Sequence, residues 1–281
     1  GFVSLFLPHY VASYGQDDFT RSMAALKYFT TFGSAEFAIR HFLLHDFKRT
    51  LAVLQAWSLD DNEHVRRLAS EGSRPRLPWS FRLTEVQANP ELCASILDNL
   101  KADSSLYVRK SVANHLNDIT KDDPDWVLSL IEGWHLDNPH TAWIARHALR
   151  SLIKQGNTRA LTVIGAGARA EVKIHHLTVT PAVITLGERI SFSFSLESTA
   201  ATAQKLVVDY AIDYVKSAGH SAAKVFKLKA FSLEAGEHHS IRREQPIREL
   251  TTRKHYPGKH SVHVLINGEK LGTAEFELLK P

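Results

Sequence analysis

The sequence predicts an α-then-β chain: an α-solenoid followed by a β-sandwich. Three observations lead to this fold class. Up to about Gly156 the apolar residues recur at helical spacing, and Asp, Asn, Ser and Pro clusters interrupt them. Inside this part, three similar segments recur about 43 and 36 residues apart. From about Val172 onward, apolar residues instead alternate with polar ones, which is the period of a strand.

Short helices are expected in the first half at residues 36–46, 48–57, 62–71, 90–100, 104–119, 124–133 and 140–155. In the three similar segments an N-cap type residue is followed by an apolar and then a basic residue, and the apolar positions are Val65, Val108 and Ile144. Their spacing is typical of HEAT-type helix pairs. Residues 72–79 break the period and contain two prolines, which predicts a stiff loop.

The second half predicts seven short strands in an immunoglobulin-like sandwich without a disulfide. Alternation is clearest at residues 190–196, 206–214 and 262–266, and Asn267-Gly268 is a hairpin signal. We place the domains at residues 1–168 and 169–281, joined through residues 158–169.

Composition narrows the function classes. Of 281 residues, 44% are hydrophobic and 23% charged, which suits a folded protein, and the net charge of +4 is mild. No apolar run approaches the ~18 residues of a membrane span, and no secretory signal is present. Cys93 is the only cysteine and fits a reducing cytoplasm. We expect a cytoplasmic, nucleoid-associated monomer without membrane or obligate protein partner. Because the chain begins at Gly1, an N-terminal segment is expected to precede it.

The second helix of each pair in a solenoid lines the concave face, which is the usual binding face. Basic residues predicted on those helices are Arg40, Arg66, Arg67, Arg109, Lys110, Arg146, Arg150 and Lys154. Arg146, Arg150 and Lys154 follow each other at intervals of four and are expected to form one stripe. For any single arginine, a solvated helix face is the better explanation. The recurrence across repeats favours a nucleic-acid partner.

Three carboxylates, Glu36, Glu71 and Asp118, interrupt this basic surface. Each has an ordinary explanation, such as an i,i+4 ion pair between Arg67 and Glu71. Together they are unexpected, because a phosphate-binding surface repels its ligand wherever it carries an anion. They suit a reaction that develops positive charge, such as glycosidic cleavage through an oxocarbenium-like sugar. One ion pair at 4 Å and effective dielectric 20 is worth about 4 kcal/mol, and a second carboxylate could activate water.

Two tryptophans are candidates for stacking on a base or sugar. Trp79 ends the proline-stiffened loop, and Trp143 lies in the first turn of an inner helix. A core position between repeats is an equally good explanation for each. Histidine pairs such as His41 and His45 lack a metal motif, and no phosphate-binding glycine loop is present. We expect neither metal nor cofactor.

Residues 63–79, with the sequence Glu-His-Val-Arg-Arg-Leu-Ala-Ser-Glu-Gly-Ser-Arg-Pro-Arg-Leu-Pro-Trp, resemble the signature of the AlkC branch of the AlkC/AlkD DNA glycosylases. Residues 143–150 resemble a segment shared by both branches. The resemblance covers the helical half, and one AlkC subgroup also has a C-terminal immunoglobulin-like domain. His64 departs from the aromatic residue that begins this helix in the AlkD branch.

The resemblance implies a monofunctional enzyme that hydrolyses the N-glycosidic bond of alkylated, cationic bases in double-stranded DNA, such as 3-methyladenine and 3-methylcytosine. It maps the carboxylates onto Glu36, Glu71 and Asp118, and the loop aromatic onto Trp79. We expect Glu36 and Asp118 to attend the sugar, in an order left open, and Glu71 to support them. Arg74 and Arg76 of the loop join the expected DNA contacts.

The alternative is a non-catalytic HEAT-repeat plus immunoglobulin-like module that binds nucleic acid or protein. It predicts that the carboxylates lie apart, each paired with a local cation, whereas the enzyme predicts that they converge on one accessible place. The sandwich has its own basic residues, which suit either a second DNA contact or a solvated rim. They are Arg242, Arg243, Arg248, Arg253, Lys254, His255 and Lys259.

Overall fold

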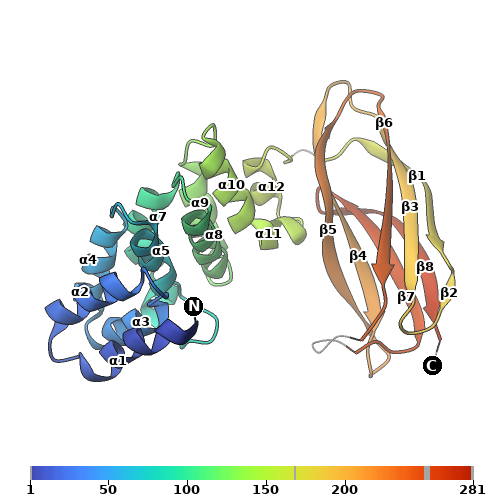
Figure 1. Cartoon of the computed structure of the whole chain (residues 1–281). Coiled ribbons are helices and arrows are strands. Elements are labelled where there is room, and N and C mark those ends of the chain that lie inside the picture. Colours follow the sequence, from blue (N-terminus) through green and yellow to red (C-terminus); the bar gives the residue numbers. More distant parts are fainter. Residues whose placement is uncertain (1, 168, 250–253, 280–281) are drawn as a thin grey trace. The chain divides into compact units, whose positions relative to one another are not determined.

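The computed structural model describes residues 2–167, 169–249 and 254–279. The chain divides into two compact units, Gly1–Ser151 and Leu152–Pro281. The first is helical and the second is mainly β-sheet (Figure 1), which confirms the predicted fold class. The proposed domain limits at residues 168 and 169 remain a prediction. Arg253, one of the predicted basic residues of the sandwich, lies outside the described residues.

Short helices succeed one another through the first unit. Polar residues begin several of them, because a side-chain oxygen there accepts a bond from a free backbone amide of the first turn. Asp18, Asp46, Asn62, Asp123 and Asn138 serve as such caps. The elements are η1 (Phe2–Leu5), α1 (Phe6–Tyr14), α2 (Phe19–Phe29), α3 (Glu36–His45), α4 (Phe47–Trp57), α5 (Glu63–Gly72), α6 (Thr84–Ala88), η2 (Pro90–Cys93), α7 (Ala94–Leu100), α8 (Leu106–Ile119), α9 (Pro124–Glu132), α10 (Pro139–Ala148) and α11 (Arg150–Lys154), of which α11 continues into the second unit.

The helices stack as the repeat spacing predicts. Helices α3, α5, α8 and α10 each contact the next in that series, and α4, α7 and α9 pack beside them. At Gly72 a Cβ would lie 2.6 Å from Cγ2 of Ile39, so only glycine allows the end of α5 to approach α3 this closely. This approach brings the start of the predicted loop against α3.

The helices differ from expectation in three places. The segment 140–155 is not one helix, because α10 ends at Ala148 and α11 begins at Arg150. Side chains bond the carbonyls at the break: Arg150 donates to His147, and Asn117 donates to Ala148. Arg146, Arg150 and Lys154 therefore do not lie on one continuous helical stripe. Helices α1 and α2 were not predicted, and the segment 90–100 begins with the 3-10 turn η2.

The second unit contains the helix α12 (Thr158–Val163), within the segment expected to join the domains. Its strands are β1 (Val172–Thr180), β2 (Val183–Ile184), β3 (Arg189–Ser198), β4 (Gln204–Val215), β5 (Ser221–Leu233), β6 (His238–Pro246), β7 (Gly258–Ile266) and β8 (Glu269–Leu278). One sheet has the order β1-β3-β6 and the other β2-β8-β7-β4-β5. The described residues thus include the two-residue strand β2 beyond the seven expected, paired parallel to β8.

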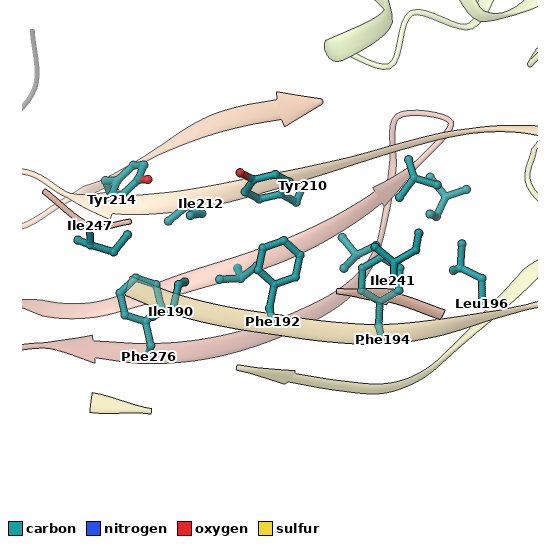
Figure 2. Packing of buried hydrophobic residues seen from close by; sticks show 14 of the residues in the cluster. Ile190, Phe192, Phe194, Leu196, Tyr210, Ile212, Tyr214, Ile241, Ile247 and Phe276 are labelled. Atoms are coloured by element: carbon teal, nitrogen blue, oxygen red, sulfur yellow. The ribbon is translucent and has the colours of Figure 1, made fainter. Parts of the chain in front are cut away.

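The two sheets enclose an apolar core (Figure 2). Ile190, Phe192 and Phe194 of β3 are buried at alternating positions and pack with residues of β4 and β7. The predicted hairpin joins β7 to β8, and both Asn267 and Gly268 have positive φ, as a type I′ turn requires. Across the described residues, no helix has the length and apolar character needed to cross a membrane.

Candidate active site

The predicted stiff loop follows α5 and presents Trp79 to solvent. The Trp79 residue is 91% exposed, and its backbone has a φ of +64°. A bulky residue adopts this left-handed conformation only at an energetic cost. Leu77, two residues earlier, is buried and anchors the loop. The alternative of a core position for Trp79 is therefore wrong, and the indole is held outward by a strained backbone.

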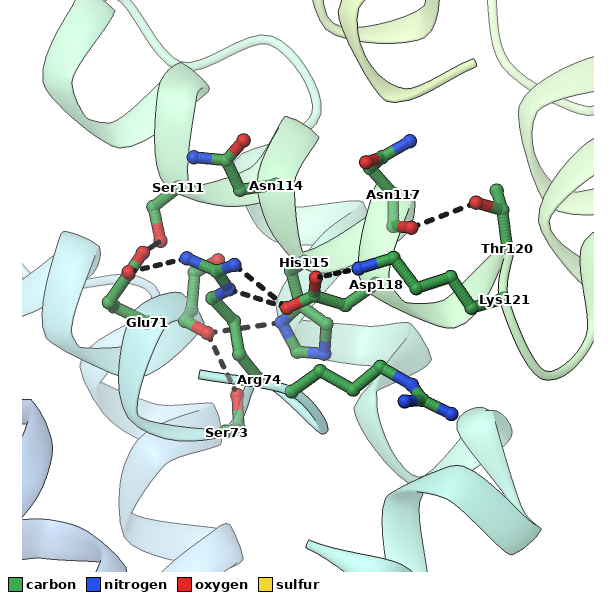
Figure 3. A network of polar contacts seen from close by, with 12 residues as sticks. Glu71, Ser73, Arg74, Ser111, Asn114, His115, Asn117, Asp118, Thr120 and Lys121 are labelled. Atoms are coloured by element: carbon green, nitrogen blue, oxygen red, sulfur yellow. Dashed lines mark hydrogen bonds and ion pairs between the residues drawn. The ribbon is translucent and has the colours of Figure 1, made fainter. Parts of the chain in front are cut away.

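The three predicted carboxylates belong to one ion-pair network, in which carboxylates and arginines alternate. Arg67 lies 3.1 Å from Glu36 and 3.3 Å from Glu71. Arg74 extends this network and lies 2.7 Å from Glu71 and 2.8 Å from Asp118 (Figure 3). These residues come from three helices and the loop, which only the tertiary structure brings together.

Hydroxyl and ammonium groups that the sequence analysis did not single out complete this ion-pair network. Ser111 donates to Glu71 at 2.6 Å, and Arg67 donates to the hydroxyl of Ser34 at 2.5 Å. Lys121 lies 3.2 Å from Asp118. A signal for part of this set was available, because Ser111 and Asp118 are seven residues apart and thus share a face of α8.

A pocket of about 450 Å³ borders the ion-pair network. Glu36 and Glu71 line it together with Arg74, and its apolar walls come from Leu5, Phe37, Leu77, Pro78 and Trp79. Asp118 is buried and is not among the lining residues. Two of the three carboxylates thus converge on one accessible place, as expected for the enzyme. All three are also paired with cations, as expected for the binding module.

One predicted DNA contact, Arg40, is contradicted by its burial. Its side chain is fully buried in α3 and donates to the backbone carbonyls of Gly72, Arg74 and Phe81. Burial, followed by the nearby positive charge of Arg74, lowers the pKa of Arg40 to about 10. A guanidinium enclosed in this way cannot reach a phosphate on the surface.

Arg66 and Arg109 serve corresponding structural purposes in successive repeats. Each stands four residues after its N-cap and donates to the carbonyls one and two residues before that cap. Arg66 also bonds Asp103 at 2.6 Å, and this hydrogen bond raises its pKa. Both guanidiniums therefore brace the turn between helices, and their predicted phosphate contacts remain untested.

The other predicted DNA contacts differ in whether their charged groups already bond other residues of the protein. Arg76 forms a bidentate pair with Asp122, which raises the pKa of Arg76, and Arg150 donates to Asn114. Lys110, Arg146 and Lys154 are exposed and make no hydrogen bond or ion pair to any described residue. These three are the most available to a phosphate.

Trp143, the second candidate for stacking, is half-buried. It stacks on His147 with ring centroids 4.9 Å apart, and the guanidinium of Arg109 lies 5.8 Å from its ring. Trp143 thus has one ring contact within α10 and one with α8, and its predicted stacking on a base remains a prediction.

A buried histidine lies next to the ion-pair network. His115 is fully buried, and its Nδ1 lies 3.0 Å from the carbonyl oxygen of Ser70, so Nδ1 carries the proton (Figure 3). Burial, followed by the positive charge of Arg74, lowers the pKa of His115 to about 3. The ring is therefore neutral near pH 7, and it adds no charge to the network.

Metal and thiol chemistry find no support in the described residues. Within residues 2–167, 169–249 and 254–279, no group of three or more His, Cys, Asp or Glu side chains could hold a metal ion. Cys93 is fully buried, and burial raises the pKa of its thiol to about 12. A thiol so protonated is a poor nucleophile.

Comparisons with known proteins agree with both units. A family model described as "DNA alkylation repair enzyme" matches residues 19–152, and one described as "Uncharacterised protein YhaZ, C-terminal Ig-like domain" matches residues 173–280. A protein of Bacillus subtilis (strain 168), the uncharacterized protein YhaZ, is 44% identical over 278 residues, which are 99% of this chain and 77% of that protein.

A solved structure is more similar still. It is the Pseudomonas fluorescens alkylpurine DNA glycosylase AlkC bound to DNA containing an abasic site analog. It is 86% identical, with a TM-score of 0.96, over 99% of this chain and 77% of that one. These matches extend through the ion-paired carboxylates, the Trp79 loop and the sandwich. The chain therefore belongs to the AlkC branch of the DNA alkylation repair family.

Proposed function

We propose that this protein is an alkylbase DNA glycosylase that hydrolyses the N-glycosidic bond of cationic, alkylated bases in double-stranded DNA. The observation that carries the proposal is the pocket in which Glu36 and Glu71 meet the exposed indole of Trp79. Carboxylates attract a cationic base and an oxocarbenium-like sugar alike. An aromatic face adds a cation–π attraction.

Glu71 is the carboxylate best suited to electrostatic stabilisation. It accepts hydrogen bonds from Ser111 and Arg74, forms an ion pair with Arg67, and therefore keeps its position while charge develops on the sugar. Such preorganised groups stabilise a transition state without reorganising during the reaction. This gives Glu71 a larger role than the supporting one expected from the sequence.

Glu36 is the carboxylate best placed to activate water. Its Oε2 bonds Arg67, whereas its Oε1 makes no hydrogen bond to any described residue. Water that attacks C1′ gives up its proton to this oxygen, and the C1′–N bond breaks as its electron pair leaves with the cationic base. The products are a neutral free base and an abasic site, so no general acid is required.

Asp118 does not line the pocket and reaches it only through Arg74. Its Oδ2 accepts a hydrogen bond from Arg74, and its Oδ1 accepts one from Lys121. In this arrangement it holds Arg74 beside Glu71. The exposed cations Lys110, Arg146 and Lys154 supply contacts to DNA phosphates. We propose that the protein works as a monomer on bacterial chromosomal DNA.

The test is release of free base from methylated DNA by wild type, Glu36→Gln, Glu71→Gln and Asp118→Asn. Wild type should release 3-methyladenine and 3-methylcytosine without cutting the DNA strand. Loss of a preorganised electrostatic group should slow release by about 100- to 1000-fold in Glu71→Gln. An exposed carboxylate outside the network, changed in Glu85→Gln, provides the matched control and should leave the rate unchanged.

No release by wild type would refute the glycosylase and leave the binding module. Full activity in all three variants would refute the assigned residues while leaving the glycosylase intact.

A further inference from the structure

Arg40 is an unusual residue, because its charge is buried without a bonded carboxylate. The side chain is 0% exposed, and every acceptor that it bonds is a backbone carbonyl. Its Nε has no partner among the described residues. Burying a charge in this way is costly, and an apolar side chain would fill the same space at lower cost. The carbonyl contacts must therefore supply something that packing alone does not.

These carbonyls bracket the Trp79 loop from both ends. Arg40 Nη1 donates to Gly72 at 3.1 Å and to Arg74 at 2.6 Å, where the loop leaves α5. Nη2 donates to Phe81, beyond the tip of the loop, and the guanidinium also lies 5.1 Å from the Phe81 ring. The rigid fork of a guanidinium can bond both sides at once, whereas a lysine ammonium is a single point.

The two ends matter because of what lies between them. Arg74, whose own carbonyl is bonded to Arg40, places its side chain between Glu71 and Asp118. Trp79, at the tip, keeps a left-handed backbone that persists only where the surroundings over-determine it. The amide of Leu83, just beyond the loop, donates to the carbonyl of Pro75 within it, which holds the two ends of the loop together further.

We propose that Arg40 is a positioning residue that clamps residues 72–81 so that Trp79 stands at the pocket and Arg74 stays between the carboxylates. It touches neither DNA nor the reacting atoms. This inference rests on the proposed function for its meaning, but the clamp itself is testable without catalysis.

The first test is tryptic cleavage of the native chain after Arg76, within the loop. The variants are Arg40→Met, which removes all three donors, and Arg40→Lys, which cannot bracket both ends. We expect cleavage after Arg76 to rise at least tenfold in Arg40→Met and less in Arg40→Lys, relative to other tryptic sites. Ile131→Ala, a cavity in α9 away from these carbonyls, is the control for general destabilisation and should raise cleavage at all sites alike.

The second test is a double-mutant cycle on DNA affinity. Arg40→Met should weaken binding to DNA with an abasic site analogue by about 5- to 150-fold, the range for one lost stacking contact. In a Trp79→Ala background the same change should weaken it no more than about twofold, since the contact that Arg40 positions is already absent.

Equal losses in both backgrounds, or unchanged cleavage after Arg76, would overturn the clamp. If Arg40→Met does not fold, Arg40→Lys decides the matter through the same two measurements. Failure of wild type to release any base would refute the proposed function instead, and neither clamp measurement depends on that result.

Discussion

The two units of this protein differ in their interiors. Both bury titratable side chains, since the sandwich buries Asp209, His260 and His263, but the helical unit links its own into a network of ion pairs beside a pocket. The sandwich encloses a core of apolar side chains, in which strands contribute residues such as Phe192 and Ile212 at alternating positions. The helical unit also has an apolar core, yet it buries Arg40, Glu71, Arg74, His115 and Asp118 within a few helices. Five titratable side chains so enclosed are not explained by stability, since apolar groups would serve it better.

This difference separates scaffold from site. In the sandwich, burial removes apolar area from water and stabilises the fold directly. In the helical unit, part of the interior is given to charges that fix each other's positions beside a pocket. A protein that holds charges in place before the substrate arrives has the preorganisation that electrostatic catalysis requires. Substitutions in the two interiors should therefore have different consequences.

The largest effect should come from the apolar core. Phe192→Ala leaves a cavity between the two sheets and should lower the free energy of unfolding of the sandwich by about 3–5 kcal/mol. Urea denaturation of the whole chain, followed by circular dichroism, measures this. Because each unit has its own core, the helical signal should persist to higher urea. A joint loss of both signals would show that the two units unfold together.

The buried histidine should make the helical unit acid-sensitive. His115 has a folded pKa of about 3 and an ordinary value near 6.5 when unfolded, so between these values the unfolded chain binds a proton that the folded chain does not. Stability should therefore fall as the pH drops below about 6.5, by about 1.4 kcal/mol per pH unit. His115→Asn keeps a donor for the Ser70 carbonyl and should flatten this dependence. Parallel pH profiles for the two proteins would contradict the assignment.

The loop should show a conflict between stability and binding. Trp79→Gly removes an exposed indole and relieves the positive φ, so the free energy of unfolding should rise by about 1 kcal/mol. Affinity for DNA should fall by about 1–3 kcal/mol because a stacking surface is lost. Thermal denaturation and fluorescence anisotropy measure the two. Unchanged affinity would remove Trp79 from the binding surface.

The smallest effect should separate free from braced arginines. Arg146→Ala should make the dependence of log Kd on log salt shallower by about 0.9, the value for one phosphate contact. Arg109→Ala should instead lower stability with the slope unchanged, since that guanidinium bonds the carbonyls of Asp103 and Ser104. An unchanged slope in Arg146→Ala would mean that Arg146 does not contact phosphate.

Much of the architecture could be predicted because it depends on local periodicity. The helical spacing up to Gly156, the repeat of Val65 and Val108, and the Asn267-Gly268 hairpin all have short-range causes. The break at Leu149 could not be predicted, because the side chain of Asn117, 31 residues before Ala148, bonds the Ala148 carbonyl at the break. The same limit applies to Arg66 and Arg109, whose acceptors are carbonyls that a residue pattern does not reveal.

Sequence alone determined which residue types the site contains: three carboxylates among arginines, and a tryptophan after a proline-containing loop. Only the tertiary structure decided what each one does. Arg40 and Arg66 occupy similar positions in the helical pattern, but one is sealed beneath a loop and the other is braced to Asp103. The reason is physical: residue type sets charge and size, whereas burial and the choice of partner depend on helices and loops distant in the chain.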